Sequence, residues 1–210
     1  MRKISLKKTK ASNPFHVIFH PFDTFYDVRV KNEGGVVFTV IILLVWFLAG
    51  IYKRQSTGYI FNYNKLSELN IFLQTAIVVI PFTVWACANW VMSIFMNGIG
   101  RFRDIWIVSA YSAVPYVLGI FLSVLLSNVL SKTEPFADYV MLFGTAWSLI
   151  LLFIGTMVIH EYKFTQNILS TILTVGVMFA ILFLAMLFGS LWSELVSFVK
   201  TVTREILFRL

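Results

Sequence analysis

The sequence predicts an all-α integral membrane protein: a bundle of five transmembrane helices, with a short amphipathic helix at the membrane surface near each end. Hydrophobic residues make up 59% of the 210 residues and charged residues only 13%, whereas a soluble domain has about a quarter charged residues. The apolar residues also gather in five blocks of the length that a helix needs to cross a bilayer, roughly 20 residues. These blocks are 35–52, 71–96, 105–130, 137–159 and 168–189.

The five blocks are almost free of charge, as segments that lie in hydrocarbon must be. They contain no Lys, Arg or Glu, and their only Asp is Asp138, at the edge of the fourth block. A chain in hydrocarbon has to satisfy its backbone hydrogen bonds internally, which favours helices. The second and third blocks contain Pro81 and Pro115, and these prolines are the expected sites of kinks.

Basic residues are distributed unevenly between the two ends of the predicted spans, and this bias predicts the orientation of the chain. Seven of the 17 Lys and Arg residues precede the first block, and Arg101, Arg103 and Lys163 lie on the same predicted side. The other seven lie on the opposite side. We therefore expect the N-terminus inside and the C-terminus outside.

The chain is expected to form one membrane domain with a segment of different character at each end. Residues 1–33 are a basic cytoplasmic arm with an interfacial helix, residues 34–189 hold the five spans, and residues 190–210 form an amphipathic helix. The charges of the arm favour attraction to the anionic lipids of the inner leaflet. Nucleic acid is not an expected partner, because the basic residues flank spans and form no continuous stripe. The C-terminal helix is expected to lie on the outer surface, or to dock on another membrane protein.

Small residues recur at four-residue spacing on several predicted spans, and such faces let membrane helices approach closely. These potential packing seams are Gly119/Ser123/Ser127, Gly144/Ser148, Gly176/Ala180 and Ala185/Gly189/Ser193. The amides Gln74, Asn89 and Asn128 are expected to form hydrogen bonds between helices.

The sequence carries no catalytic, nucleotide-binding or metal-binding motif, so no enzyme activity, cofactor or metal ion is expected. The spans also lack the ionisable groups that ion-coupled transport usually needs. In NGIGRFRD, Gly98 and Gly100 are expected to give a tight turn its conformational freedom. His160, followed by Glu161, is expected to cap the fourth span at the membrane interface.

The stretch HPFDTFYDV, at residues 20–28, concentrates histidine, acidic and aromatic residues just before the first span. On one unbroken helix, His16, His20, Asp23 and Asp27 would share a face and could be metal ligands. Pro21 argues against this helix, because proline pushes the preceding residue away from helical angles and suits a first helical turn. The break is expected to separate the histidines from the aspartates.

A short interfacial helix that begins at Pro21 is therefore predicted. Its apolar stripe would lie in the inner membrane surface and consists of Phe22, Phe25, Tyr26 and Val30. Its wet side would carry Asp23, Asp27 and Lys31, with Asp27 and Lys31 spaced as an i,i+4 ion pair. The stretch from His20 to Asp27 is thus a candidate surface for a partner protein.

The segment AYSAVPYVLG, at 110–119, contains a tyrosine–serine–x–x–proline pattern formed by Tyr111, Ser112 and Pro115. With five spans and an inside N-terminus, this pattern resembles the Yip1 family of membrane proteins. Further segments are similar, in the same order, to the bacterial branch of that family: HPFDTFYD, STGYIFN, PFTVWACANW, GIGRFRDIW and MVIHEYKFTQNILST. Asn97 departs from the pattern, since an acidic residue is expected there in many relatives.

The resemblance implies a non-enzymatic scaffold or accessory protein in a bacterial plasma membrane. Eukaryotic members act in vesicle traffic with Rab-type GTPases, a partner that does not carry over to a bacterial-type chain with an arm of about 34 residues. Bacterial relatives are associated with carbohydrate ABC-transporter genes, which implies a permease as the partner. Asn89, Tyr111, Ser112, Pro115 and His160 complete the candidate interface residues.

Two other functions remain open from the sequence. The chain could be a small-solute or lipid transporter that uses Pro81 and Pro115 as hinges, with Asn89, Tyr111 and Asn128 as polar lining. An intramembrane enzyme is the third hypothesis, and it has the least support because no nucleophile–base or metal set is visible.

Overall fold

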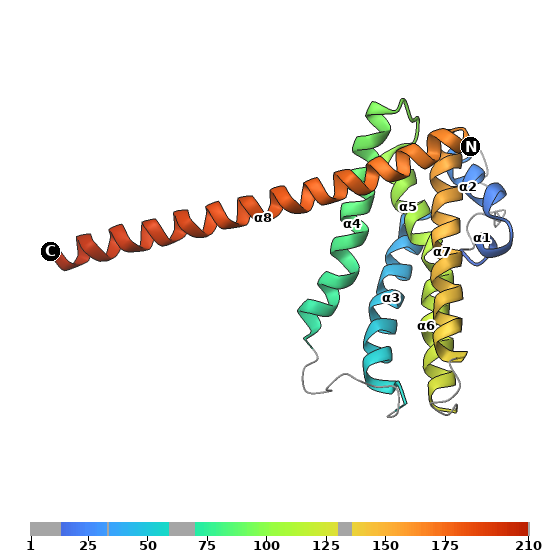
Figure 1. Cartoon of the computed structure of the whole chain (residues 1–210), viewed down its shortest axis with the longest axis horizontal. Coiled ribbons are helices and arrows are strands. Elements are labelled where there is room, and N and C mark those ends of the chain that lie inside the picture. The colour runs from blue at the N-terminus through green and yellow to red at the C-terminus, as the bar shows by residue number, and fades with distance from the viewer. Residues whose placement is uncertain (1–13, 33, 59–69, 130–135, 210) are drawn as a thin grey trace, which may run out of the picture.

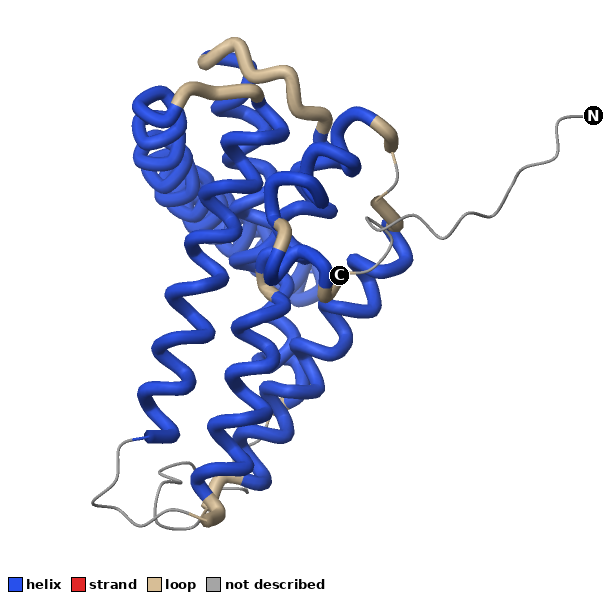
Figure 2. The backbone as a smooth tube through the Cα atoms, turned by 90° about the vertical axis from the view of Figure 1, so that its right-hand side faces the viewer, coloured by secondary structure: helices blue, strands red, loops and turns tan. Residues whose placement is uncertain are grey.

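The computed structural model describes residues 14–32, 34–58, 70–129 and 136–209, and every regular element in these ranges is a helix (Figures 1 and 2). The helices are α1 (His16–Phe19), α2 (Pro21–Val30), α3 (Val36–Ser56), α4 (Ile71–Phe95), α5 (Phe102–Ser112), α6 (Val114–Ser127), α7 (Phe136–His160) and α8 (Phe164–Arg209). Five helical stretches in the described ranges are long and apolar enough to cross a membrane: α3, α4, α5 with α6, α7, and α8. The predicted all-α fold with five spans is confirmed.

Local sequence signals explain where some of the spans begin and end. α4 follows Asn70, whose side-chain oxygen accepts hydrogen bonds from the backbone N–H groups of Phe72 and Leu73. These bonds satisfy two of the donors that a helix N-terminus leaves unpaired. α3 ends with Lys53 and Arg54 in its last turn, where positive charge interacts favourably with the helix dipole.

The third span is broken in its middle. α5 ends at Ser112 and α6 begins two residues later, with Pro115 in its first turn. The first-turn N–H groups of α6 therefore lack partners in their own helix, and the N–H of Tyr116 donates to Ser148 Oγ of α7 at 2.9 Å. The third span is thus interrupted beside Pro115, where a kink was expected, whereas α4 continues unbroken through Pro81.

The broken third span is the centre of the bundle. In its most apolar window 72% of the residues are buried, compared with 17% to 28% for α3, α4 and α7. Small residues bring it close to α7: a Cβ added to Gly144 would lie 2.9 Å from the carbonyl oxygen of Pro115 and 3.2 Å from the Cα of Gly119. The seams predicted at Gly119 and Gly144 therefore pack against each other.

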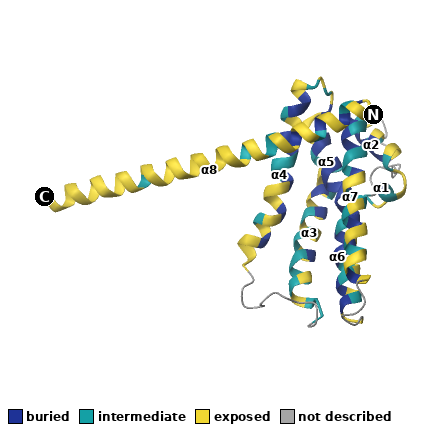
Figure 3. Cartoon of the chain, viewed as in Figure 1, coloured by how far each residue is buried: buried dark blue, intermediate teal, exposed yellow. Residues whose placement is uncertain are grey.

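α8 is one unbroken helix of 46 residues, about 69 Å long at 1.5 Å per residue. Its first turns lie against α4 and α7, and the remainder runs away from the bundle and across its axis (Figure 1). From residue 175 to residue 208 its side chains are mostly exposed (Figure 3). The segment 190–210 is helical as expected in its described part, but it continues α8 and does not form a separate helix.

α2 packs against the bundle through one face and leaves the other exposed. Phe25 and Val28 are buried among side chains of α5 and α7, with Phe25 at 0% exposure, whereas Phe22 and Tyr26 are more than half exposed. The expectation that Phe25 lies in the membrane surface is therefore wrong. Gly155 of α7 is the reason, because a Cβ there would lie 3.2 Å from the Phe25 ring, and its absence leaves room for the ring.

Candidate functional site

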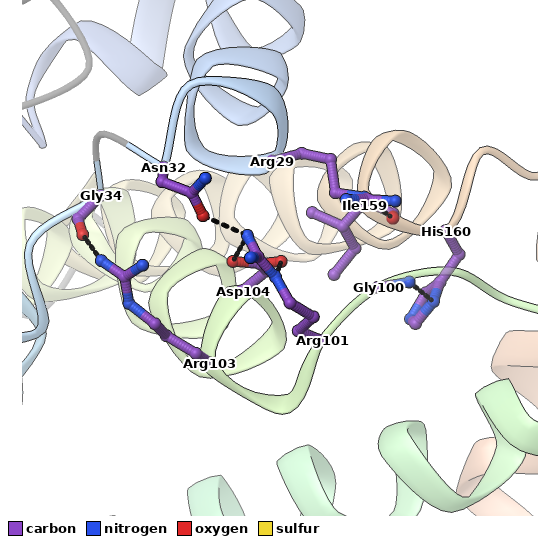
Figure 4. A network of polar contacts seen from close by, with 9 residues as sticks. All are labelled: Arg29, Asn32, Gly34, Gly100, Arg101, Arg103, Asp104, Ile159 and His160. Carbon is purple, nitrogen blue, oxygen red and sulfur yellow. Dashed lines mark hydrogen bonds and ion pairs between the residues drawn. The ribbon is translucent and has the colours of Figure 1, made fainter.

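The residues singled out from the sequence lie in three separate places. The stretch 20–28 forms most of α2, on the side of the bundle. Asn89 and His160 meet at the end of the bundle where α4 and α7 finish. The other three, Tyr111, Ser112 and Pro115, border the break in the third span. The second place holds the most connected polar cluster, part of which Figure 4 shows.

His160 is the centre of this cluster. It is the last residue of α7 and is only 2% exposed. Its Nδ1 accepts a hydrogen bond from the backbone N–H of Gly100 at 3.3 Å, which places the proton on Nε2, and Nε2 donates to Asn89 Oδ1 at 2.9 Å. The expectation that His160 caps the fourth span at the membrane interface is therefore wrong. Its side chain is buried and joins α7 to α4 and to the α4–α5 connection.

Gly98 and Gly100 lie where the α4–α5 connection passes over His160. A Cβ on Gly98 would lie 2.6 Å from His160 Nδ1, and a Cβ on Gly100 would lie 2.8 Å from the same atom. Neither glycine has a positive φ, so the expected reason for them is wrong: they permit a close approach. The left-handed residue is Asn97, with φ 56°, and Asn tolerates that conformation better than most residues.

Asp104, at the start of α5, is a fully buried carboxylate whose partner is Arg101. The guanidinium contacts the carboxylate through Nε at 2.9 Å and through Nη2 at 3.3 Å. The hydrogen bond and the charge of Asp104 raise the pKa of Arg101. Nη2 also donates to the side-chain oxygen of Asn32, which follows α2. The pair therefore links α5 to the connection between α2 and α3.

Two more arginines reach backbone carbonyl groups near this end of the bundle (Figure 4). Arg29 of α2 donates from Nε to the carbonyl oxygen of Ile159 at 3.1 Å, near the C-terminus of α7. Arg103 of α5 donates from Nη2 to the carbonyl oxygen of Gly34 at 2.8 Å. Carbonyl groups at a helix C-terminus lack hydrogen-bond partners within the helix, and Arg29 supplies a donor to one of them.

α2 begins as its sequence predicts. Pro21 is its first residue, and Asp23 lies in its first turn. The expected i,i+4 ion pair is present, with 2.7 Å between Asp27 Oδ1 and Lys31 Nζ. The first turn of α2 and its ion pair therefore agree with the prediction, whereas the expected separation of the aspartates from the histidines does not.

The break at Pro21 does not separate the histidines from the aspartates. The rings of His16 and His20 stack with their centroids 4.7 Å apart, and His16 Nδ1 lies 2.9 Å from Thr24 Oγ1. Both histidines line one surface hollow of about 350 Å³ together with Asp23 and Asp27. Among the described residues, however, no three His, Cys, Asp or Glu side chains are grouped so that they could hold a metal ion.

Tyr111, Ser112 and Pro115 are internal residues of the third span. All three are buried, and the Ser112 hydroxyl donates to the carbonyl oxygen of Val108 at 2.8 Å. The tyrosine–serine–x–x–proline pattern therefore shapes the helix break, and its side chains are not presented to a partner.

Sequence reasoning missed Arg29, Asp104 and Tyr162 as members of the polar cluster. Arg101 and Asp104 are three residues apart, a spacing that could have indicated their pairing on a helix. No sequence signal connects Arg29 with Ile159, since 130 residues separate them. The ring of Tyr162 stacks on His160 with 5.1 Å between centroids, and burial raises the pKa of its hydroxyl, which keeps it neutral.

The chemistry of the cluster favours cohesion over catalysis. The His160 ring nitrogens bond to an amide and to a backbone N–H, and the Asp104 carboxylate bonds to Arg101. A general base or nucleophile needs a lone pair directed at a substrate, and these groups direct theirs at the protein itself. The cluster therefore holds α2, α4, α5 and α7 together at one end of the bundle.

A comparison with protein families matches one model over most of the chain. The model is described as the Yip1 domain, and it matches residues 15–187. The match begins just before α1 and ends within α8, so it includes α3 to α7 in full. Comparisons with curated proteins and with solved structures give no match.

Proposed function

This chain belongs to the Yip1 domain family of membrane proteins, and from that premise we propose that it is a non-enzymatic accessory protein that binds another integral membrane protein. The observation that carries the proposal is the course of α8. After its first turns this helix leaves its own bundle, and its residues are mostly exposed (Figure 3). Many of these exposed residues are large and apolar. We propose that α8 is the element that packs against the partner.

The small residues of α8 support this assignment by contrast with those of α6 and α7. Gly119 and Gly144 pack against each other inside the bundle. Gly176 and Gly189 carry the same kind of spacing, but an added Cβ would meet nothing within 4 Å at either position. Small residues on a helix face let another helix approach closely in lipid. Within the described residues, no helix packs against Gly176 or Gly189 of α8.

Two amide side chains of the bundle support a non-enzymatic role, because they form hydrogen bonds between helices. Asn89 joins α4 to α7, and Asn128 donates to the carbonyl oxygen of Ser56, which joins α6 to α3. These amides have the interhelical use expected of them. They contribute to holding the spans in place.

The finer parts of the proposal come from the resemblance and from the charge bias. We propose a bacterial plasma membrane location with a cytoplasmic N-terminus, where anionic lipids attract the basic arm. The first partner to test is a carbohydrate ABC-transporter permease, because the bacterial branch is associated with such transporters.

The test is affinity purification of the tagged full chain in mild detergent from its native membrane, with variants of α8. Gly176→Leu and Gly189→Leu place side chains in open space, so we expect a correctly folded protein that loses a stoichiometric membrane partner. Met186→Leu is the matched control, because it changes an exposed residue of α8 at nearly constant volume. Recovery of a monomer or homo-oligomer alone would contradict the proposal.

The alternative, a small-solute or lipid transporter, needs revision. Asn89 and Tyr111 of its expected polar lining are buried at 2% and 0% exposure, and neither lines the cavity beside Pro81. A cavity does lie beside Pro81, and this observation keeps the alternative open. Vesicles that contain the purified chain should show flux of sugars or scrambling of lipids if it is a transporter, and absence of both would rule this function out.

A further inference from the structure

A cavity of about 260 Å³ lies between the spans and is partly open to the outside of the bundle. Four of the five spans contribute to its wall, namely α3, α4, α5 with α6, and α7, and its members include Trp46, Pro81, Trp85, Ser112, Tyr116 and Leu149. Pro81 of α4 and the break between α5 and α6 at Ala113 border it. Pro81, one of the two prolines that the sequence marks as sites of bending, thus lies in the wall of the cavity.

The cavity lies at the depth of the hydrocarbon. Trp46 is near the middle of α3, Pro81 is near the middle of α4, and Leu149 is near the middle of α7. A helix of this length crosses a hydrocarbon core of roughly 30 Å, so the middle of these spans falls close to the bilayer centre. The surroundings of the opening are therefore lipid chains and not water.

Three hydroxyl groups of the wall are already engaged within the protein, which leaves the cavity mostly apolar, although Trp85 Nε1 has no hydrogen-bond partner among the described residues. Ser112 donates to the carbonyl oxygen of Val108 at 2.8 Å, and Thr145 donates to that of Met141 at 2.8 Å. Ser148 Oγ accepts the N–H of Tyr116 at 2.9 Å. A buried water needs about two to four polar partners, and a sugar needs more, so neither suits this wall.

We propose that this cavity binds one acyl chain of a bilayer lipid. A dry apolar cavity of about 150 Å³ in a soluble protein takes up benzene, so a larger one open to hydrocarbon takes up a chain segment. A transmembrane helix is about 10 Å wide and does not fit the cavity, although one side chain of a partner helix could. An acyl chain has the required width, polarity and depth. This inference does not depend on the proposed function.

The experiment uses the two tryptophans of the wall as reporters. The full chain is reconstituted in phosphatidylcholine vesicles in which a growing fraction of the lipid carries two bromine atoms at mid-chain. Bromine quenches tryptophan on contact, so Trp46 and Trp85 should show a quenching component that saturates at a low bromolipid fraction. The same vesicles with Trp85→Phe should lose part of that component.

Filling the cavity supplies the decisive comparison. Thr145→Phe places a ring in the wall and removes only a hydrogen bond within α7, so the saturating component should be lost. Leu142→Phe is the matched control, because it adds a ring to an exposed position of α7 outside the cavity, and the component should remain. If circular dichroism shows that Thr145→Phe does not fold, Leu152→Phe replaces it, because Leu152 also lies in the wall. Equal quenching curves in a folded wall variant and in Leu142→Phe would overturn the proposal, as would the absence of a saturating component.

Discussion

His160 Nε2 and Asn89 Oδ1 lie 2.9 Å apart, although 71 residues separate them in the chain. Because both side chains are buried, this hydrogen bond fixes the ends of α4 and α7 relative to each other at a depth that water does not reach. Its partner bond from Gly100 adds the α4–α5 connection to the same imidazole. One neutral histidine therefore organises three segments of the protein.

We expect Asn89→Ala to lower the free energy of unfolding by about 1–3 kcal/mol, because it leaves the buried Nε2–H of His160 without an acceptor. Thr201→Ala is the control: it removes an exposed hydrogen bond within α8, and its effect should stay within about 0.5 kcal/mol. Thermal unfolding in one detergent, followed by circular dichroism, measures both. Equal losses in the two variants would show that the imidazole bridge does not stabilise the fold.

Glycine-to-alanine changes should have different effects on stability in the α4–α5 connection and in α8. Gly100→Ala places a methyl group 2.8 Å from the His160 ring and 3.2 Å from a backbone carbonyl oxygen, so we expect a loss of about 1–3 kcal/mol. Gly176→Ala enters open space within a helix, where alanine is favoured over glycine, so the melting temperature should stay constant or rise. A loss at Gly176 in the isolated protein would contradict the arrangement of α8.

Phe25→Ala should destabilise the protein severely, by about 3–5 kcal/mol, because it leaves a cavity between α2, α5 and α7. Phe22→Ala, three residues away on the exposed side of α2, should change stability by less than about 0.5 kcal/mol. Denaturation of the two variants distinguishes these outcomes. For partner binding at α2, Phe22 and Tyr26 are therefore the informative positions, since loss of a partner in Phe25→Ala would report unfolding.

The orientation inferred from charge can be tested by the sidedness of cysteine labelling. In a Cys87→Ser background, Ile99→Cys marks the α4–α5 connection and Lys53→Cys marks the opposite end of the bundle. A maleimide that does not cross membranes should label position 53 in intact cells and position 99 only after the cells are opened. The reverse pattern would show that the N-terminus is outside.

Composition and local rules predicted the features that depend on neighbours in sequence. The five spans follow from long uncharged blocks, the start of α2 follows from the geometry of Pro21, and the third span is interrupted beside Pro115, where a kink was expected. Each of these depends on residues within one or two turns. Such constraints operate whatever the rest of the chain does.

The features that could not be predicted depend on contacts between distant segments. The Phe25 ring is buried because Gly155 leaves room for it, and His160 is buried because Gly98 and Gly100 allow the connection to close over it. In the sequence, Phe25 belonged to an amphipathic stripe that looked suited to lipid. Only the packing partner decides whether such a stripe faces lipid or protein.

The attachment of α8 gives it mechanical leverage. Its base is held by Asn167, which donates to the carbonyl oxygen of Phe153, and by Gln166, which donates to that of Met96. The rest of a rod about 69 Å long extends beyond these two anchors. A rotation of a few degrees where α4 and α7 grip the helix therefore displaces its far end by several ångströms. A small shift at the His160 bridge would therefore become a larger displacement at a neighbour bound near the far end of α8.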